Sequence, residues 1–175
     1  MSLLEDKFQM VTQDPRPGAY GGIWEDFIPE EVATAEAAGV GPGVPAASGT
    51  FAPGTIPPGR ILELNSNGRV QDGNSQDITA NYAKVFWVAF EGDTDFSSAY
   101  AGKVTCVHGG MRIETTQFVT GQSYVSGRPV IVSGGQLAPK AAVGDHIQAV
   151  GIVGPNGVNA DGVLDVYLVQ GIPTV

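Results

Sequence analysis

The chain has 175 residues, 42% of them hydrophobic, with 25 Gly and 12 Pro, and this composition predicts one β-rich domain with many turns and an appendage. Its net charge of −9 and its nine scattered basic residues argue against a nucleic-acid-binding role. The single cysteine excludes an internal disulfide. No apolar run reaches the ~20 residues that span a bilayer, so we expect no membrane partner.

Residues 1–58 are expected to form an extended N-terminal arm. The start of the chain lacks the basic residues and the continuous apolar core of a secretory signal, which predicts synthesis in a cytoplasm. Most of the prolines lie in this segment, and such a density is incompatible with strand ladders. One short helix is expected over Val32–Ala38, because Pro29 and two acids precede it and Gly39 follows it.

The arm also contains four large apolar side chains close together, which are Tyr20, Trp24, Phe27 and Ile28. Trp and Tyr are the residues that most often anchor interfaces. We expect Trp24 and Phe27 to be buried at a subunit boundary, against a neighbouring copy or another protein. The alternative is that they fold back onto the β-rich body of their own chain.

Residues 59–175 are expected to form that β-rich body. Its first strand is predicted over Arg60–Leu64, with a turn at Asn65–Gly68 and a return strand over Arg69–Gln71. The next strand, over Lys84–Phe90, is apolar on both faces, which is typical of a central strand.

A pair of glycines then separates a strand over Lys103–His108 from a strand over Met111–Phe118. Two glycines between strands are typical of a β-hairpin. The predicted hairpin places Cys106 opposite Ile113.

The last third of the chain, residues 120–171, consists of short apolar runs separated by Gly-rich turns. Gly134-Gly135 lies between Val130–Ser133 and Gln136–Ala138 and predicts a second hairpin, because a two-residue turn needs positive φ angles. No side chain in this stretch has the setting of a catalyst, and we expect a scaffold.

The sequence contains an internal echo. The stretch G-R-I-L-E-L-N-S-N-G-R-V from Gly59 resembles G-R-P-V-I-V-S-G-G-Q-L from Gly127. Each stretch precedes a Val-rich strand, a polar loop and a Gly-led strand; the Val-rich strands are 84–90 and 146–153, and the Gly-led strands start at Gly102 and Gly162. We expect a duplicated meander of about eight or nine strands, arranged as a small β-sandwich or partly closed barrel.

Chemical groups that could form a site are few. Cys106 and His108 share one strand face, about 7 Å apart by strand rise, which is awkward for direct pairing. His146 is the only other histidine, so a zinc site lacks ligands, and Asp145 is expected to bond nearby backbone. The loop Asp72–Asp77 lacks the spacing of a calcium loop. We expect no catalytic residue, no metal site and no cofactor.

The order of these strands resembles a known family. The runs V-T-C-V-H-G-G-M-R-I-E-T-T-Q-F, Y-V-S-G-R-P-V-I-V-S-G-G-Q-L-A-P, V-G-D-H-I-Q-A-V-G-I-V and G-V-L-D-V-Y-L are similar to the capsid decoration (cement) proteins of tailed bacteriophages, over roughly residues 84–171. The resemblance implies a β-tulip fold and a homotrimer on the capsid exterior, made in the host cytoplasm. It also implies that the protein clamps neighbouring major capsid subunits and is not an enzyme. The shell is then one candidate partner for the aromatic residues of the arm.

Two other functions remain open. One is another virion subunit, such as a tail-tube or head–tail joining ring protein. The other is a receptor-binding or glycan-binding spike domain, which requires exposed aromatic residues in the loops 91–101 and 154–162, where only Phe96 and Tyr100 qualify. A secreted or metal-dependent enzyme ranks below both.

Overall fold

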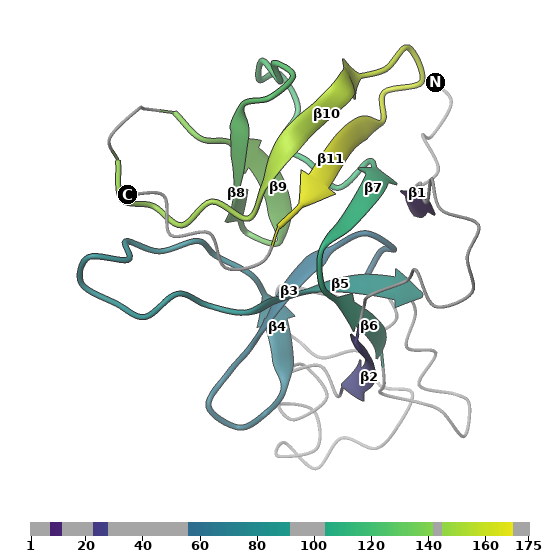
Figure 1. Ribbon diagram of the computed structural model, residues 1–175. Helices are drawn as coiled ribbons and strands as arrows, with labels where there is room; N and C mark the ends of the chain where they lie inside the picture. The colour runs from purple at the N-terminus through teal and green to yellow at the C-terminus, as the bar shows by residue number, and fades with distance from the viewer. Residues whose placement is uncertain (1–7, 12–22, 28–55, 92–103, 142–144, 170–175) are drawn as a thin grey trace.

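The computed structural model describes residues 8–11, 23–27, 56–91, 104–141 and 145–169. In these ranges the chain forms eleven strands in two antiparallel sheets (Figure 1). The strands are β1 (Phe8–Val11), β2 (Ile23–Phe27), β3 (Ile61–Leu64), β4 (Val70–Asp72), β5 (Phe86–Glu91), β6 (Val104–His108), β7 (Met111–Thr115), β8 (Pro129–Ser133), β9 (Gln136–Pro139), β10 (Gly151–Val158) and β11 (Leu164–Leu168). Sheet A has the order β1-β7-β11-β10-β8-β9, and sheet B has the order β2-β6-β5-β3-β4.

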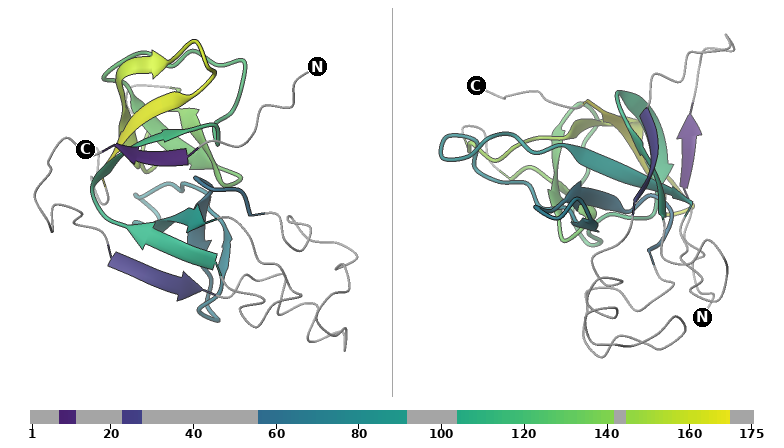
Figure 2. Two further views of the ribbon diagram at one scale, coloured as in Figure 1. Left: turned by 90° about the vertical axis from the view of Figure 1, so that its right-hand side faces the viewer. Right: turned by 90° about the horizontal axis from the view of Figure 1, so that it is seen from below.

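The prediction of a mainly β fold is confirmed. The two sheets lie one above the other, and β1 and β2 run along the same side of the molecule, next to β7 and β6 (Figure 2). The described strands form no closed barrel, because each sheet keeps two edge strands. Within the ranges above, no helix is long and apolar enough to cross a membrane.

Two predicted hairpins are present. The turn between β8 and β9 has φ angles of 54° at Gly134 and 72° at Gly135, and it aligns Ser133 with Gln136. Positive φ at both central residues is the requirement of a type I′ turn, which glycine meets without strain. The turn between β3 and β4 is held by the Asn65 side chain, whose Oδ1 accepts the backbone N–H of Arg69 at 3.1 Å.

The expected hairpin between β6 and β7 is wrong. The two strands belong to different sheets, and Cys106 is aligned with Ala89 of β5 and Glu25 of β2 instead of Ile113. Gly109 has a φ of 141°, which does not fit a type I′ turn. The chain therefore passes from sheet B to sheet A at this point, and β7 continues the path of β6 (Figure 1).

The expectation that residues 1–58 form no ladder is also wrong. β1 pairs with β7, with Phe8 opposite Thr115, and β2 pairs with β6, with Phe27 opposite Val104. Both strands are short and lie at the edges of their sheets, where the ladder is needed on one side only. The prolines flank these strands and do not interrupt them. The helix expected over Val32–Ala38 lies outside the described residues.

The internal echo is confirmed as a repeat of strand order. Five strands of sheet B, β2-β6-β5-β3-β4, are matched by five strands of sheet A, β7-β11-β10-β8-β9. We call the former the first unit and the latter the second unit, with β1 as an addition to the second. The strand expected over 146–153 begins later, at Gly151, because Ile147 forms a bridge with Asp77 of the first unit.

The repeat extends to individual registers and hydrogen bonds. A row is a set of residues that lie opposite one another on neighbouring strands. One row of the first unit consists of Ile61, Val88 and Val107. The equivalent row of the second unit consists of Pro129, Ile152 and Tyr167. Gly59 N donates to Ala89 O at 2.7 Å, and Gly127 N donates to Val153 O at 2.9 Å. The two glycines also have similar φ angles, 84° and 79°. The two units therefore share one topology in detail.

β5 is the central strand that was predicted, and it separates two apolar clusters. Phe86 and Val88 belong to the main cluster, which joins the apolar residues of sheet A, whereas Trp87 and Ala89 belong to a second cluster. The second cluster comprises Phe27, Ile56, Leu62, Val70, Trp87, Ala89, Val104 and Cys106. Alternation of side chains along β5 thus makes sheet B apolar on both faces.

The two glycines of the β8–β9 turn offer a matched test of this packing. An added Cβ at Gly134 would meet nothing within 4 Å, but at Gly135 it would fall on Asp72 Oδ1 and Arg60 Nε, which form an ion pair at 2.7 Å. We expect Gly134→Ala to cost about 1–2 kcal/mol from its left-handed backbone alone. Gly135→Ala should cost clearly more, because it also separates the ion pair. Denaturant unfolding measures both, and equal losses would contradict this packing.

Candidate interaction surfaces

The structure places the four predicted anchor residues unequally. Tyr20 and Ile28 lie outside the described residues. Trp24 lies in β2 with its Cα opposite Val107. Phe27 is buried in the second cluster, with its ring edge-on to Trp87 at a centroid distance of 4.6 Å. For Phe27, the structure therefore matches the alternative in which the segment folds back onto its own body.

Cys106 and His108 have separate surroundings. Cys106 is fully buried, and its thiol donates to Val104 O at 3.8 Å. The Nδ1 of His108 lies 3.2 Å from Phe86 O, and its ring lies 5.1 Å from that of Trp87. One ring nitrogen of His108 is thus directed to a backbone carbonyl, which fits the expected buried thiol beside a separate histidine.

The acidic residues of the loops bond to nearby groups. Asp72 forms a two-bond ion pair with Arg60, with both distances 2.7 Å. Asp77 accepts the hydroxyl and the backbone N–H of Thr79, which hold the pKa of Asp77 below its usual value. Asp145 accepts the N–H of the backbone two residues on, as expected. Across the described ranges, no three Asp, Glu, His or Cys residues are grouped as metal ligands.

A buried carboxylate braces the start of β5. Glu63 is buried and accepts hydrogen bonds from Lys84 Nζ at 2.8 Å and from Gln71 Nε2 at 3.0 Å. The side chain of Gln148 then clamps the backbone of Lys84, donating to its O at 2.7 Å and accepting its N–H at 2.8 Å. A buried charge with several partners resists displacement, because its removal leaves the others unpaired. This bracing ties the two units together.

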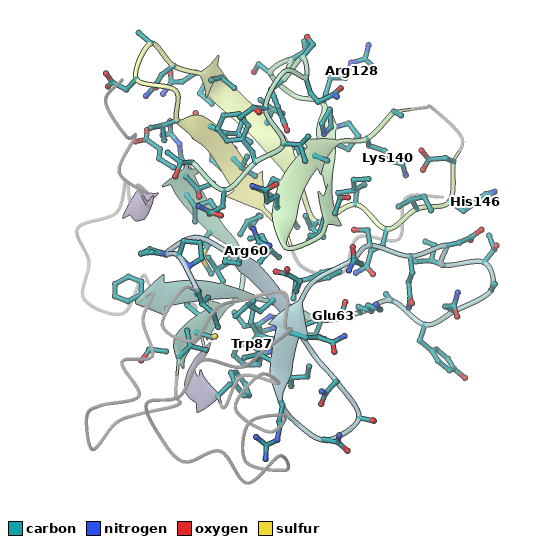
Figure 3. The ribbon with its side chains drawn as sticks, turned by 180° about the vertical axis from the view of Figure 1, so that it is seen from behind. Arg60, Glu63, Trp87, Arg128, Lys140 and His146 are labelled. Atoms are coloured by element: carbon teal, nitrogen blue, oxygen red, sulfur yellow. The ribbon has the colours of Figure 1, made fainter. Side chains whose placement is uncertain are left out.

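The bracing also supports a projecting pair of loops. Residues 73–85 of the first unit and 145–148 of the second unit lie side by side, with Asp77 bridged to Ile147 and Ile78 N donating to His146 O at 3.0 Å. These loops extend from one side of the body (Figure 1), where Figure 3 also places Lys140 and His146. Gln76 Nε2 donates to Tyr82 O, which closes the end of the longer loop. The loop is therefore held in one shape by its own bonds.

Three exposed apolar side chains lie along this loop and the adjoining strand. Tyr82 is 95% exposed, Val85 is 52% exposed and Leu64 is 41% exposed. Glu63 is aligned with Phe86 in the β3–β5 ladder, so Leu64 and Val85 occupy the next step of that register. We call Leu64 and Val85 the apolar patch; Tyr82 lies on the loop that precedes it. Sequence reasoning missed the patch, because Leu64 and Val85 become neighbours only through the pairing of β3 with β5.

A second exposed surface lies on the outer face of sheet A. It follows the row Pro129, Ile152 and Tyr167, continued by Arg112 of β7; we call it the outer row. Ile152 is 39% exposed, and the Arg112 guanidinium lies 5.4 Å from the centre of the Tyr167 ring. Arg112 also forms a two-bond pair with the buried Asp165, which raises the pKa of Arg112. The outer row is thus mainly apolar and partly exposed, with a neutralised cation at the position that pairs with Val11 of β1.

Comparison of the chain with protein-family models, with curated proteins and with solved structures finds no match.

Phe27 should act as a core residue. We expect Phe27→Ala to lower the free energy of unfolding by about 3–5 kcal/mol, because it removes a buried ring from the second cluster. Tyr82→Ala is the matched control, since Tyr82 is 95% exposed and its removal should leave stability unchanged. Thermal or denaturant unfolding measures both variants. A loss for Phe27→Ala no larger than for Tyr82→Ala would show that the ring is not packed on its own body.

Tyr124 should give the molecule an alkaline transition. Burial raises the pKa of Tyr124 to about 12, and its hydroxyl donates to Val119 O at 2.8 Å. A raised folded-state pKa contributes stability below the ordinary tyrosine pKa of about 10 and loses it as pH rises to the folded value. The advantage of wild type over Tyr124→Phe in unfolding free energy should therefore shrink between pH 10 and 12. An advantage that is constant with pH would rule out this assignment.

Proposed function

We propose that the chain is a structural virion protein that binds the outside of a phage capsid and cements neighbouring major capsid subunits. It acts as a homotrimer with a β-tulip-like body, without a cofactor and without catalysis. It is made in the host cytoplasm and resides on the capsid exterior. The proposal rests on the resemblance of residues 84–171 to decoration proteins and on the physical features that follow.

The observation that carries the proposal is the anchoring of the N-terminal segment at two points. β1 extends sheet A and β2 extends sheet B, and the ring of Phe27 fastens β2 to the second cluster. A segment that starts from fixed points of a body can reach across a subunit boundary with less loss of conformational entropy than a free tail. Presentation of the same segment by three copies increases the effective concentration of each.

The body has the stiffness that a clamp needs. Two hydrogen bonds between the Gln148 side chain and the backbone of Lys84 connect the two units, and the main apolar cluster contains side chains of both sheets. Force applied to one unit is then transmitted to the other through packed side chains and not through a linker. Such a body resists separation of the subunits that it contacts.

The negative net charge of the chain favours binding to the outside of the shell over binding to the packaged genome. The chain has a net charge of −9, which repels the phosphate backbone of DNA. Tyr20, Trp24 and Ile28 are the proposed contacts with the shell or a neighbouring copy. Phe27 has a different part in the proposal, as the residue that holds the segment to the body.

The experiment is a binding assay with undecorated shells of the phage that encodes the chain. We expect co-sedimentation of the protein with the shells and added density at threefold positions in electron microscopy. Tyr20→Ala combined with Ile28→Ala should weaken shell binding at least tenfold while the melting temperature stays unchanged. Phe27→Ala is the matched comparison, since it should lower the melting temperature.

Three results would contradict the proposal. The first is failure of the wild-type protein to bind the shells. The second is assembly into rings with tail or portal components, which indicates a tail-tube or joining protein. The third is binding to host-cell glycans in place of shells, which indicates a spike domain.

A further inference from the structure

The internal repeat shows how one unit contacts another. In the first unit, the row Ile61, Val88 and Val107 is 1% exposed at each position and belongs to the main cluster with residues of sheet A. The equivalent row of the second unit is the outer row, in which Ile152 is 39% exposed. A row that is buried in an interface in one unit is thus partly exposed to solvent in the other.

The apolar patch shows the complementary difference. Leu62 and Leu64 of β3 correspond to Val130 and Val132 of β8, since Leu62 is aligned with Trp87 as Val130 is with Gly151. Val132 is 2% exposed, whereas Leu64 is 41% exposed. By the same correspondence Val85 takes the place of Ala149; Ala149 is buried and Val85 is 52% exposed. The face of the second unit that includes Val132 is therefore covered. The corresponding face of the first unit is exposed at Leu64 and Val85.

We propose that the outer row of one copy packs on the apolar patch of a second copy, in a head-to-tail contact. Inside the chain, the row of the first unit packs with the face of the second unit that includes Val132. Between two copies, the outer row takes the place of the first unit's row, and the patch takes the place of the second unit's face. A head-to-tail contact uses two different surfaces on each copy, so it closes into a ring when the rotation between copies permits. Three copies in such a ring form a trimer.

Electrostatics permit this contact in spite of the acidic chain. The loop residues 78–83, Ile-Thr-Ala-Asn-Tyr-Ala, carry no charge, and the cation of the outer row is neutralised by its bonds to Asp165. Lys84 beside the patch and Arg112 in the outer row are each paired with an acid, and repulsion between charged copies falls off within a Debye length of about 8–10 Å.

This contact between copies deepens the proposed function and rests on it only for the number of copies, which is three. The contact is therefore tested in solution without shells, so that its failure can be told apart from a failure of shell binding. Ile152→Glu damages the outer row and leaves the patch intact, whereas Val85→Glu damages the patch and leaves the row intact. Light scattering after size exclusion gives the mass of each variant alone and of their equimolar mixture. Val158→Glu is the control, because Val158 is 41% exposed and belongs to neither surface. Circular dichroism checks that each variant is folded, and Leu64→Glu replaces Val85→Glu if the latter unfolds.

We expect wild type and Val158→Glu to be trimers and each of the other variants to be a monomer. The mixture should form a one-to-one dimer, because one intact row then meets one intact patch. A mixture that stays monomeric would exclude a head-to-tail contact, as would variants that keep the trimer. Loss of the trimer in Val158→Glu would show that any added charge dissociates the copies and would overturn the assignment of surfaces. A monomeric wild type would overturn this inference without affecting shell binding.

Discussion

The rest of the molecule depends on one contact, in which a row of apolar side chains of sheet B packs against the inner face of sheet A. Ile61, Val88 and Val107 reach the main cluster from sheet B, and burial of each such side chain stabilises by about 1.5–3 kcal/mol. This contact sets the distance at which Gln148 reaches Lys84 and at which the two projecting loops pair. Both exposed surfaces owe their positions to it.

Local signals in the sequence predicted the elements that depend on a few neighbouring residues. The Gly134-Gly135 turn is an example, because two positive φ angles nearly define it. Gly109-Gly110 has the same letters but joins two sheets, since β6 pairs with β5 and β2 whereas β7 pairs with β1 and β11. Exposure of Tyr82 likewise depends on which loops pair, and no window of sequence contains that information. Long-range choices of partner were therefore the main source of error.

The repeat changes how the Pro-rich segment is understood. β2 is the first strand of the first unit, as β7 is of the second. Residues 28–55 therefore stand where the second unit has only residues 116–123, and the segment is an insertion within a unit as well as part of an N-terminal arm. The compact unit retains the shared topology, and the enlarged unit carries the additional sequence. Such a division lets new contacts develop without disturbing the shared core.

The placement of β1 and β2 has a consequence during synthesis. Each of them pairs with a strand that lies much later in the chain, so both leave the ribosome long before their partners exist. An unpaired, apolar strand in a nascent chain is open to pairing with neighbouring chains. Pro15, Pro17 and Pro29 lie beside these strands, and proline next to an aggregation-prone run interrupts the spread of such pairing. The prolines thereby act as gatekeepers until β6 and β7 emerge.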